Sequence, residues 1–342
     1  MEEKKSRTKM LVSAVLFPLI AAAMLFLVFR NYDLGSVWRL AASADFCWLL
    51  PAIAAMLGFV VCESVNIARV LRASGYRVGF GQMLTYGAAG FFFSGITPTS
   101  SGGQPMQLVY MARDHIRFSH GSLSLLVELT GFQMANLSLA VFGLLYNGAR
   151  IRAMSAGLRA VIAVGLGANG AVFLVLLLLI FHQKSSEGIG KLLKRVCRAM
   201  KKENLSGRIE EQLLEYRAGA VYIREHPGLI LRNIATSFVQ LTAICSIPYF
   251  VYRSLGGASV GWAEIFSLQA VLAASTAVIP LPGAVGAGES GFRLIFASVF
   301  PESLLMPGML LSRGISFYLC LLLTGAYLLV NFICRKAGGS GK

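Results

Sequence analysis

The chain has 342 residues, of which 56% are hydrophobic and 14% are charged, and its mean hydropathy is +0.67. A soluble domain of this size would carry about one quarter charged residues, so the composition excludes an ordinary soluble protein. The net charge of +15 would suit a nucleic-acid partner, but most of the 31 Lys and Arg residues lie in short clusters between apolar runs. That alternation is typical of cytoplasmic loops in a multi-pass membrane protein. We therefore expect a membrane protein without a nucleic-acid partner.

Six apolar runs are long enough to cross the bilayer, which takes about 20 residues. They are Met10–Phe29, Cys47–Ala68, Ser119–Tyr146, Gly157–Phe181, Leu229–Val251 and Leu305–Phe332. No Ala-x-Ala-like cleavage site closely follows the first run, so we expect it to remain as a helix. The basic clusters lie at residues 1–9, 69–77, 113–117, 184–232 and 335–342. Their positions predict that both termini are cytoplasmic.

Two polar stretches separate some of these runs. Residues 30–45 are amphipathic and are expected at the outer membrane surface. Residues 183–228 form the only sizeable polar insert, with an apolar face of Leu192, Leu193, Val196 and Met200 opposite Lys and Arg. This cytoplasmic amphipathic insert fits a helix on the inner leaflet, held by anionic lipid, and fits a solvated loop helix equally well.

Two further apolar segments are interrupted by Gly and Pro. Residues 82–111 contain the break TPTSSGGQ, and residues 264–300 contain the break PLPGAVGAGE. If each segment enters and leaves the membrane on one face, every basic cluster falls in the cytoplasm. The first hairpin then enters from the cytoplasm and the second from outside. Ordinary loops between short helices remain the alternative.

The two broken segments also align with each other at an offset of 182 residues. Gln82 then matches Glu264, Ala88 matches Ala270, Ser94 matches Thr276, and Pro98 matches Pro280. Broken segments in corresponding positions are typical of inverted-repeat transporters, whose binding site lies between the breaks. The predicted fold is an all-α polytopic membrane protein: one domain over residues 1–342, with about six full transmembrane helices and two re-entrant hairpins in an inverted repeat.

The chemistry of the breaks suits an anion. Unwound backbone is tolerated in a membrane only where it is buried in protein or lines a polar cavity. A helix beginning near Gln104 would point N–H groups at that cavity and favour a phosphate. The candidate binding residues here are Thr97, Pro98, Thr99, Ser100, Ser101, Gly102, Gly103 and Gln104 in the first break, and Pro282, Gly283 and Gly286 in the second.

Charged residues inside apolar runs complete the candidate site. Each costs at least ~2.5–3.5 kcal/mol at the bilayer centre, so such residues usually pair or line a pathway. We expect Arg313 or Arg293 to meet a lipid phosphate, with Glu128 or Glu289 balancing that charge or contacting a cationic headgroup. A purely structural buried pair is the alternative. Glu63 and Glu264 fall near the ends of their runs, where they are expected to reach water.

Three segments resemble a known family. GITPTSSGGQPMQLVY and IPLPGAVGAGESGF resemble the two signatures of the flippase-like transmembrane domain of bacterial lysylphosphatidylglycerol synthase/flippase proteins, and LSRGISFYL is similar to that family's Arg-containing final helix. The resemblance covers roughly residues 10–335. It implies a multi-pass protein of the bacterial cytoplasmic membrane that moves phospholipid, with lysyl-phosphatidylglycerol or phosphatidylglycerol as cargo, between leaflets.

One difference from the full bifunctional family bears on activity. The sequence ends at Lys342 without a soluble aminoacyl-transfer domain, so we expect the lipid-translocating half and not the tRNA-dependent phosphatidylglycerol lysyltransferase that the family name implies. A polyprenyl-phosphate or small-anion transporter and a scaffold that docks a partner through residues 183–228 stay open, as does a homo-oligomer. No nucleotide-binding motif and no metal-ligand spacing is present, so no cofactor and no metal is expected, and movement would be passive or ion-coupled.

Overall fold

The computed structural model describes residues 44–97, 101–181, 225–276 and 287–339, and single residues at 39, 42 and 221. The chain divides into two units, Met1–Ala44 and Asp45–Lys342, and all the contacts described here lie within the second. The described residues of that unit are helical, without strands, which confirms the predicted fold class. The expected surface stretch at residues 30–45 and the insert at residues 183–228 lie almost entirely outside the described residues.

Among the residues that the structure describes, five helices are long and apolar enough to cross a membrane. They are α3 (Phe46–Ala73), α6 (Phe118–Tyr146), α8 (Ala156–Phe181), α11 (Pro227–Ser254) and the continuous run Glu302–Arg335, which contains α14 (Glu302–Arg313), η3 (Gly314–Leu319) and the start of α15 (Cys320–Gly339). A short helix, α7 (Gly148–Ala153), joins α6 to α8. Each of the five agrees with a predicted span. The sixth, Met10–Phe29, lies outside the described residues.

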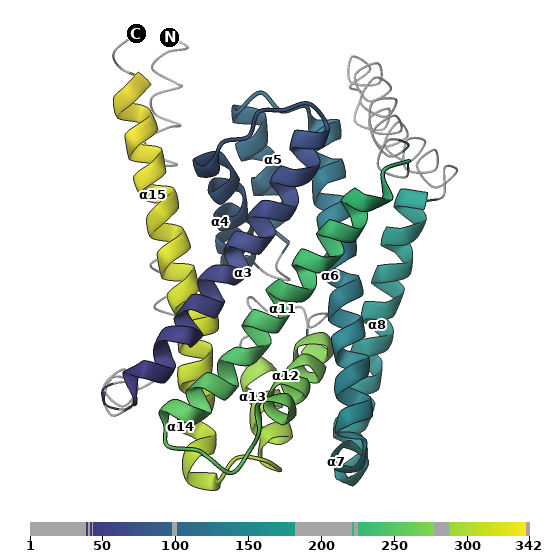
Figure 1. Ribbon diagram of the computed structural model, residues 1–342, viewed down its shortest axis with the longest axis vertical. Helices are drawn as coiled ribbons and strands as arrows, with labels where there is room; N and C mark the ends of the chain where they lie inside the picture. The colour runs from purple at the N-terminus through teal and green to yellow at the C-terminus, as the bar shows by residue number, and fades with distance from the viewer. Residues whose placement is uncertain are drawn as a thin grey trace. The chain divides into compact units, whose positions relative to one another are not determined.

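Two pairs of shorter helices lie in the two broken segments. The first pair is α4 (Phe80–Ile96) and α5 (Gly103–Arg113), and the second is α12 (Trp262–Thr276) and α13 (Ala287–Phe296). The longest of the four, α4, has 17 residues, which at 1.5 Å per residue gives about 26 Å. That is less than the ~30 Å hydrocarbon core, so none of them spans it alone. Figure 1 shows α4 and α5 in one half of this unit and α12, α13 and α14 in the other.

The helix starts repeat along the chain in the way the sequence alignment predicts. The first four helices are α3, α4, α5 and α6, and the corresponding second set is α11, α12, α13 and α14. From the first residue of each helix to that of its counterpart the offsets are 181, 182, 184 and 184 residues (46 to 227, 80 to 262, 103 to 287, 118 to 302). The repeat is therefore one of whole helices, in the order long, short, short, long, where α14 is the beginning of the long last span Glu302–Arg335.

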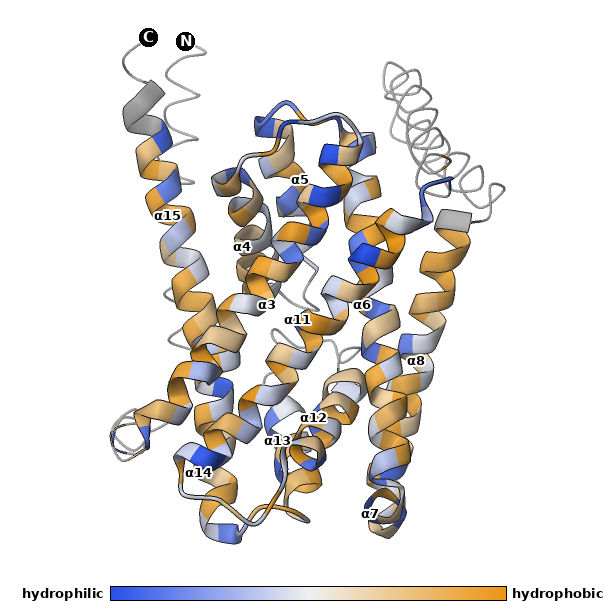
Figure 2. Ribbon diagram, viewed as in Figure 1, coloured by the Kyte–Doolittle hydropathy of each residue, from blue (hydrophilic) through white to orange (hydrophobic). Residues whose placement is uncertain are grey.

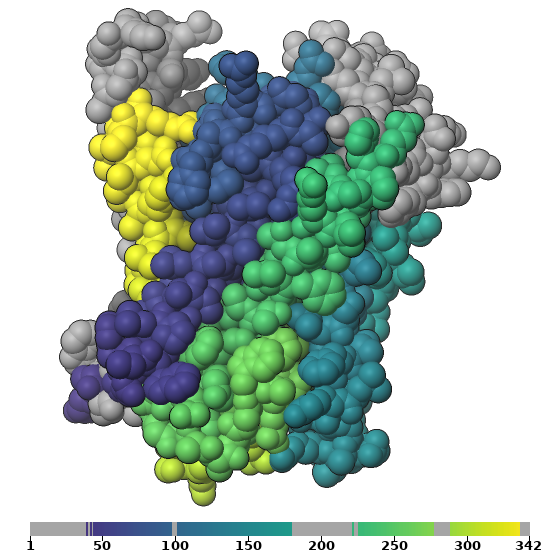
Figure 3. All heavy atoms as spheres, in the orientation of Figure 1, coloured from purple at the N-terminus to yellow at the C-terminus, as the bar shows by residue number. Residues whose placement is uncertain are grey.

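The two leading helices of these sets, α3 and α11, run in opposite directions and pack along their lengths (Figure 3). Asp45 N, at the start of α3, donates to Ser254 O at the end of α11 across 2.8 Å. At the other end, Arg69 donates to Asn66 and Asn233 at 2.9 Å each. Because this guanidinium also donates to Thr236 at 2.9 Å, its polar groups are satisfied by protein, and the cluster fixes the register of the two helices.

The last span changes its winding partway along. The α-helical α14 ends at Arg313, η3 is a π-helical segment, and α15 continues to Gly339. Short π-helical segments inside α-helices are frequent at functional sites, because the extra residue per turn redirects the side chains beside it. Arg313 is the residue directly before this segment.

The outer faces of the described helices are largely apolar (Figure 2). Leu145, Val164, Leu174 and Val330 are among the large hydrophobic side chains that are more than half exposed. A soluble protein rarely leaves apolar patches of this extent in water, so these faces fit contact with lipid. Inside, α12 packs on α6, α8 and α11. Its backbone lies so close to α8 that a Cβ at Gly165 would be 2.2 Å from Ser275 O.

Candidate functional site

Arg313 lies inside the protein, on the last span, and faces the second pair of short helices. Its side chain is 20% exposed, and its Nε lies 3.5 Å from Glu289 Oε1. The guanidinium also lies over the ring of Phe317, 5.0 Å from the ring centre. A Cβ at Gly288 would be 3.6 Å from the guanidinium carbon, so the start of α13 approaches Arg313 closely. Tyr318 Oη donates to Glu289 Oε1 across 3.2 Å and holds that carboxylate in place.

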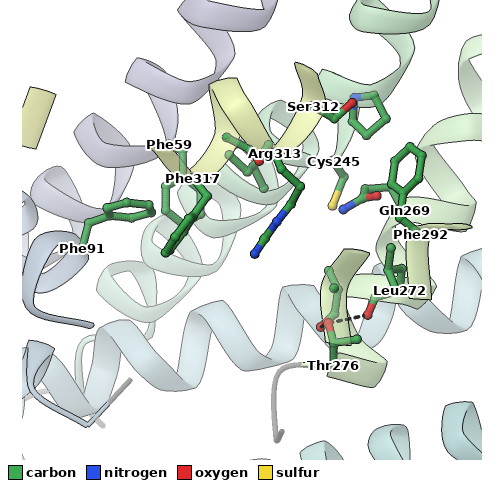
Figure 4. Close-up of a pocket in the computed structure, with 15 residues that line it drawn as sticks. Phe59, Phe91, Cys245, Gln269, Leu272, Thr276, Phe292, Ser312, Arg313 and Phe317 are labelled. Atoms are coloured by element: carbon green, nitrogen blue, oxygen red, sulfur yellow. Dashed lines mark hydrogen bonds between the residues drawn. The ribbon is translucent and has the colours of Figure 1, made fainter. Parts of the chain in front are cut away.

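The Arg313 side chain reaches a cavity of about 220 Å³. Helices of both broken segments line it, together with α3, α11 and the last span: Phe59, Phe91, Ile244, Cys245, Pro248, Gln269, Leu272, Ala273, Thr276, Gly288, Phe292, Ser312, Arg313, Ser316 and Phe317. Figure 4 shows Arg313 extending between Phe317 on one side and Gln269 and Leu272 on the other. The wall is mostly aromatic and aliphatic, so the Arg313 guanidinium lies in largely apolar surroundings.

Two polar atoms of this wall have no hydrogen-bond partner in the described part of the chain: Gln269 Oε1 and Ser312 Oγ. Ser312 is only 4% exposed, so water does not fully solvate its hydroxyl. A buried polar atom without a partner costs about 1–3 kcal/mol and calls for an explanation, of which a bound ligand is one. The arrangement thus offers a cation, a hydroxyl and an amide oxygen to a small polar group.

The described residues of the first break satisfy one another and do not line this cavity. Thr97 Oγ1 donates to Phe93 O at 2.6 Å and accepts from Gly102 N at 2.9 Å. Gly103 is buried against α4, where a Cβ would be 2.7 Å from Gly90 O, so close packing requires glycine there. Ser101 is exposed and Gln104 half-buried. Pro98, Thr99 and Ser100 lie outside the described residues.

The predicted residues of the second segment separate into two groups. Glu289 and Arg313 meet, as described above. Arg293, the other candidate for a lipid phosphate, is exposed on α13 and does not line the cavity. Pro282, Gly283 and Gly286 lie outside the described residues. Glu264, at the other end of α12, forms an ion pair with Arg150.

Glu128 lies on α6, apart from the Arg313 cavity. It is 6% exposed, and it faces Glu63 on α3, because Phe132 and Phe59, one helical turn from each, are in ring contact. Glu63 lies ten residues from the end of its helix, because α3 continues to Ala73 beyond the predicted end at Ala68, and its side chain is half-buried. Gln107 Nε2, on α5, donates to Glu63 Oε1 across 2.9 Å. These two carboxyl groups form a second polar centre.

Four polar residues of the cavity escaped the sequence analysis: Gln269, Thr276, Ser312 and Ser316. The signal for Gln269 was present, since it is the only amide within the apolar run SLQAVLAAS of α12. The signal for Ser312 was its position beside Arg313. Thr276 carried little signal, because its hydroxyl donates to Leu272 O at 2.9 Å, as threonine commonly does within a helix.

Comparison with known proteins agrees with the fold and with the motifs around this cavity. Residues 10–324 match the family model described as the lysylphosphatidylglycerol synthase TM region. A "UPF0104 membrane protein" of Archaeoglobus fulgidus is 23% identical over 293 residues, which cover 84% of this chain and 87% of that protein. Since the family match spans most of the chain and includes both broken segments and Arg313, this multi-pass membrane protein belongs to the lysylphosphatidylglycerol synthase transmembrane-region family.

Proposed function

We propose that this protein moves a phospholipid between the leaflets of the membrane, and that Arg313 binds the phosphate of the headgroup during transfer. The observation that carries the proposal is the Arg313 cavity, which helices of both broken segments line. A buried arginine in a membrane is costly, so its retention favours a role in a pathway. Arginine also matches phosphate better than lysine does, because its planar fork donates two parallel hydrogen bonds.

The surroundings of Arg313 support an anionic ligand. The first turn of α13 borders the cavity at Gly288, and a helix start carries N–H groups and a partial positive charge. Glu289, in that same turn, balances the guanidinium. A phosphate arriving at Arg313 would replace this carboxylate, which would then be available to a lysyl or other cationic headgroup. On this basis phosphatidylglycerol and lysyl-phosphatidylglycerol are the proposed cargo.

The proposed pathway uses the helix repeat. We propose that the pairs α4–α5 and α12–α13 are re-entrant hairpins that enter from opposite faces, the first from the cytoplasm. The antiparallel course of α3 and α11 supports this, because two halves whose leading helices oppose each other are inverted. Alternating access would then open the cavity to one leaflet at a time, with the acyl chains remaining in lipid.

The test is lipid movement in liposomes that contain the purified protein and labelled phosphatidylglycerol or lysyl-phosphatidylglycerol. Arg313→Ala is compared with Arg293→Ala, which removes the same charge from an exposed site. A hydrogen bond to a charged group contributes about 1.5–3 kcal/mol, so Arg313→Ala should slow transfer roughly tenfold to hundredfold. Arg293→Ala should stay within about twofold of the parent. The proposal would be refuted if every lipid tested moved at the same rate in liposomes with and without the protein.

Transport of a small anion is the second candidate, and the size of the cavity favours it. The volume of about 220 Å³ is below the ~300–1,000 Å³ of most ligand sites, so a free phosphate would fill it as well as a headgroup would. The same liposomes loaded with labelled inorganic phosphate distinguish the two. Arg313-dependent phosphate uptake without lipid movement would assign this second function.

A further inference from the structure

A pair of acidic side chains lies outside the Arg313 cavity, on two helices that face each other. Glu63 is on α3 and Glu128 on α6, and the two helices run in opposite directions (Figure 1). Phe59 and Phe132 make an edge-to-face contact with ring centres 6.4 Å apart. Glu63 lies four residues after Phe59, and Glu128 four residues before Phe132. Since four residues make about one helical turn, both carboxyl groups lie one turn from this contact, on the same side.

The pair lies deep in the membrane-spanning part of both helices. Glu63 is ten residues from the end of α3 at Ala73, and Glu128 is ten residues from the start of α6 at Phe118. At 1.5 Å per residue, each lies about 15 Å from that end. Because α3 and α6 have 28 and 29 residues, or about 42–44 Å, both groups lie within about 6 Å of the middle of their helices. A helix of that length centred on the ~30 Å hydrocarbon core keeps both carboxyl groups inside it.

The residues that the structure describes do little to neutralise these groups, of which Glu63 is half-buried and Glu128 buried. Glu128 is 6% exposed and accepts no hydrogen bond from any residue that the structure describes. Glu63 accepts one, from Gln107 Nε2, and a Cβ at Gly90 would be 2.6 Å from its Oε1. The Cys320 thiol, at the start of α15, is a further titratable group near Glu63 in the described part of the chain. Arg69, further along α3, is bound by the Asn66, Asn233 and Thr236 side chains.

Two carboxylates that share a desolvated site cannot both ionise without a large cost. Neutralisation by Ca²⁺ would take six to eight oxygen ligands, and by Mg²⁺ about six. Around the pair, the described residues supply the two carboxyl groups and the Gln107 amide, which are too few. One proton neutralises one of the two groups without further ligands.

We propose that Glu63 and Glu128 form a binding site for one proton within the membrane-spanning part of the protein. The amide of Gln107 donates to Glu63, so Glu63 is the carboxylate and Glu128 carries the proton. The proton site does not depend on the proposed lipid transfer. The use of this proton as the coupling ion does rest on that function. The pair is placed for such coupling because it borders α4 and α5 of the first broken segment, through Gly90 and Gln107.

The test is infrared spectroscopy of the purified protein, in which a protonated carboxyl group gives a carbonyl band that shifts in D₂O. The parent should show this band at neutral pH, and the double variant Glu63→Gln/Glu128→Gln should lack it. Glu302→Gln is the matched control, because Glu302 is exposed on α14 and its replacement should leave the band unchanged. The proposal would be overturned if the parent and the double variant gave the same spectrum in the carbonyl region. So would loss of the band when Na⁺ is added at constant pH, since that would show that the site takes a metal cation.

The single variant Glu128→Gln keeps the test decisive if the double variant does not fold. Removing Glu128 removes the like charge beside Glu63, so the remaining carboxyl group should lose its proton at a lower pH than the parent pair does. An unchanged transition would show that the two groups do not share a site. A proton gradient that drives lipid movement in the parent but not in the double variant would add the coupling role. The infrared result stands whether or not lipid moves.

Discussion

The close approach of α8 to α12 gives a prediction whose size can be worked out from the structure. In Gly165→Ala the new Cβ would lie 2.2 Å from Ser275 O and 2.7 Å from Ser275 Cα. Both atoms belong to the α12 backbone, so no side-chain rotation relieves the clash and the two helices must separate by about 1 Å or more. Overpacking of this kind costs about 1–3 kcal/mol, and we expect the upper end because backbone must move.

The matched control is Gly167→Ala on the same helix, where nothing lies within 4 Å of the added Cβ. Alanine is favoured over glycine in a helix by about 0.8–1.0 kcal/mol, so this variant should be neutral or slightly more stable. The same gain partly offsets the clash at Gly165. The free energy of unfolding of Gly165→Ala should therefore fall about 2 kcal/mol below the parent, and about 3 kcal/mol below Gly167→Ala.

The assay is denaturant titration of the purified protein in mixed micelles, with the thermal midpoint as a second readout. Gly165→Ala should also slow transport, because α12 supplies Gln269, Leu272 and Thr276 to the cavity. Asn169 adds to the effect, since it bridges Gln133 on α6 to the α12 backbone beside this contact. Equal stability of the two alanine variants would refute the tight contact between α8 and α12.

Three further predictions follow from individual contacts. Tyr318→Phe removes the hydrogen bond to Glu289 and should lower the free energy of unfolding by about 1 kcal/mol. A lipid-binding titration should show that anionic phospholipid still binds at Arg313. A loss of binding as large as that of Arg313→Ala would contradict this. Asp114→Ala removes the acceptor of the hydrogen bonds from Tyr86 Oη (2.7 Å) and Arg335 Nη1 (2.8 Å), so amide hydrogen exchange near the end of α15 should become faster. Unchanged exchange would show that other contacts hold α15. Glu264→Gln breaks the ion pair with Arg150, which is 44% exposed, and should change the free energy of unfolding little, because exposed pairs contribute about 0–1 kcal/mol. A fall of more than about 2 kcal/mol in that free energy would contradict the prediction.

Hydropathy and charge predicted most of the helices because each long span needs a continuous apolar run. The starts of α4 and α12 were predicted to within two residues, at Gln82 and Glu264 against Phe80 and Trp262 in the structure. The end of α3 was not predicted, because its last turns carry the polar residues Asn66, Arg69 and Arg72, which pack against α11 or donate to loop carbonyls. A hydropathy window excludes such residues, whereas a partner helix stabilises them.

The candidate site was predictable only in part. Arg313 and Glu289 were identifiable as charges inside apolar runs, but their meeting depends on how α13 packs on the last span. Nothing in the spacing favoured Arg313 over Arg293, which the structure places on an exposed face. The contribution of α3 and α4 to the cavity, through Phe59 and Phe91, comes from tertiary packing of ordinary apolar residues. Aromatic side chains in such runs carry no local signal of a site.

The central claim is that the cavity at Arg313 receives the phosphate of a membrane lipid. The most direct test is a density map of the protein in a bilayer of phosphatidylglycerol. We predict a headgroup between the helices of the two broken segments, with phosphate oxygens within about 3 Å of the Arg313 guanidinium and near the Ser312 hydroxyl. A cavity without lipid, in a map that shows ordered phosphate at Arg293 instead, would contradict the account.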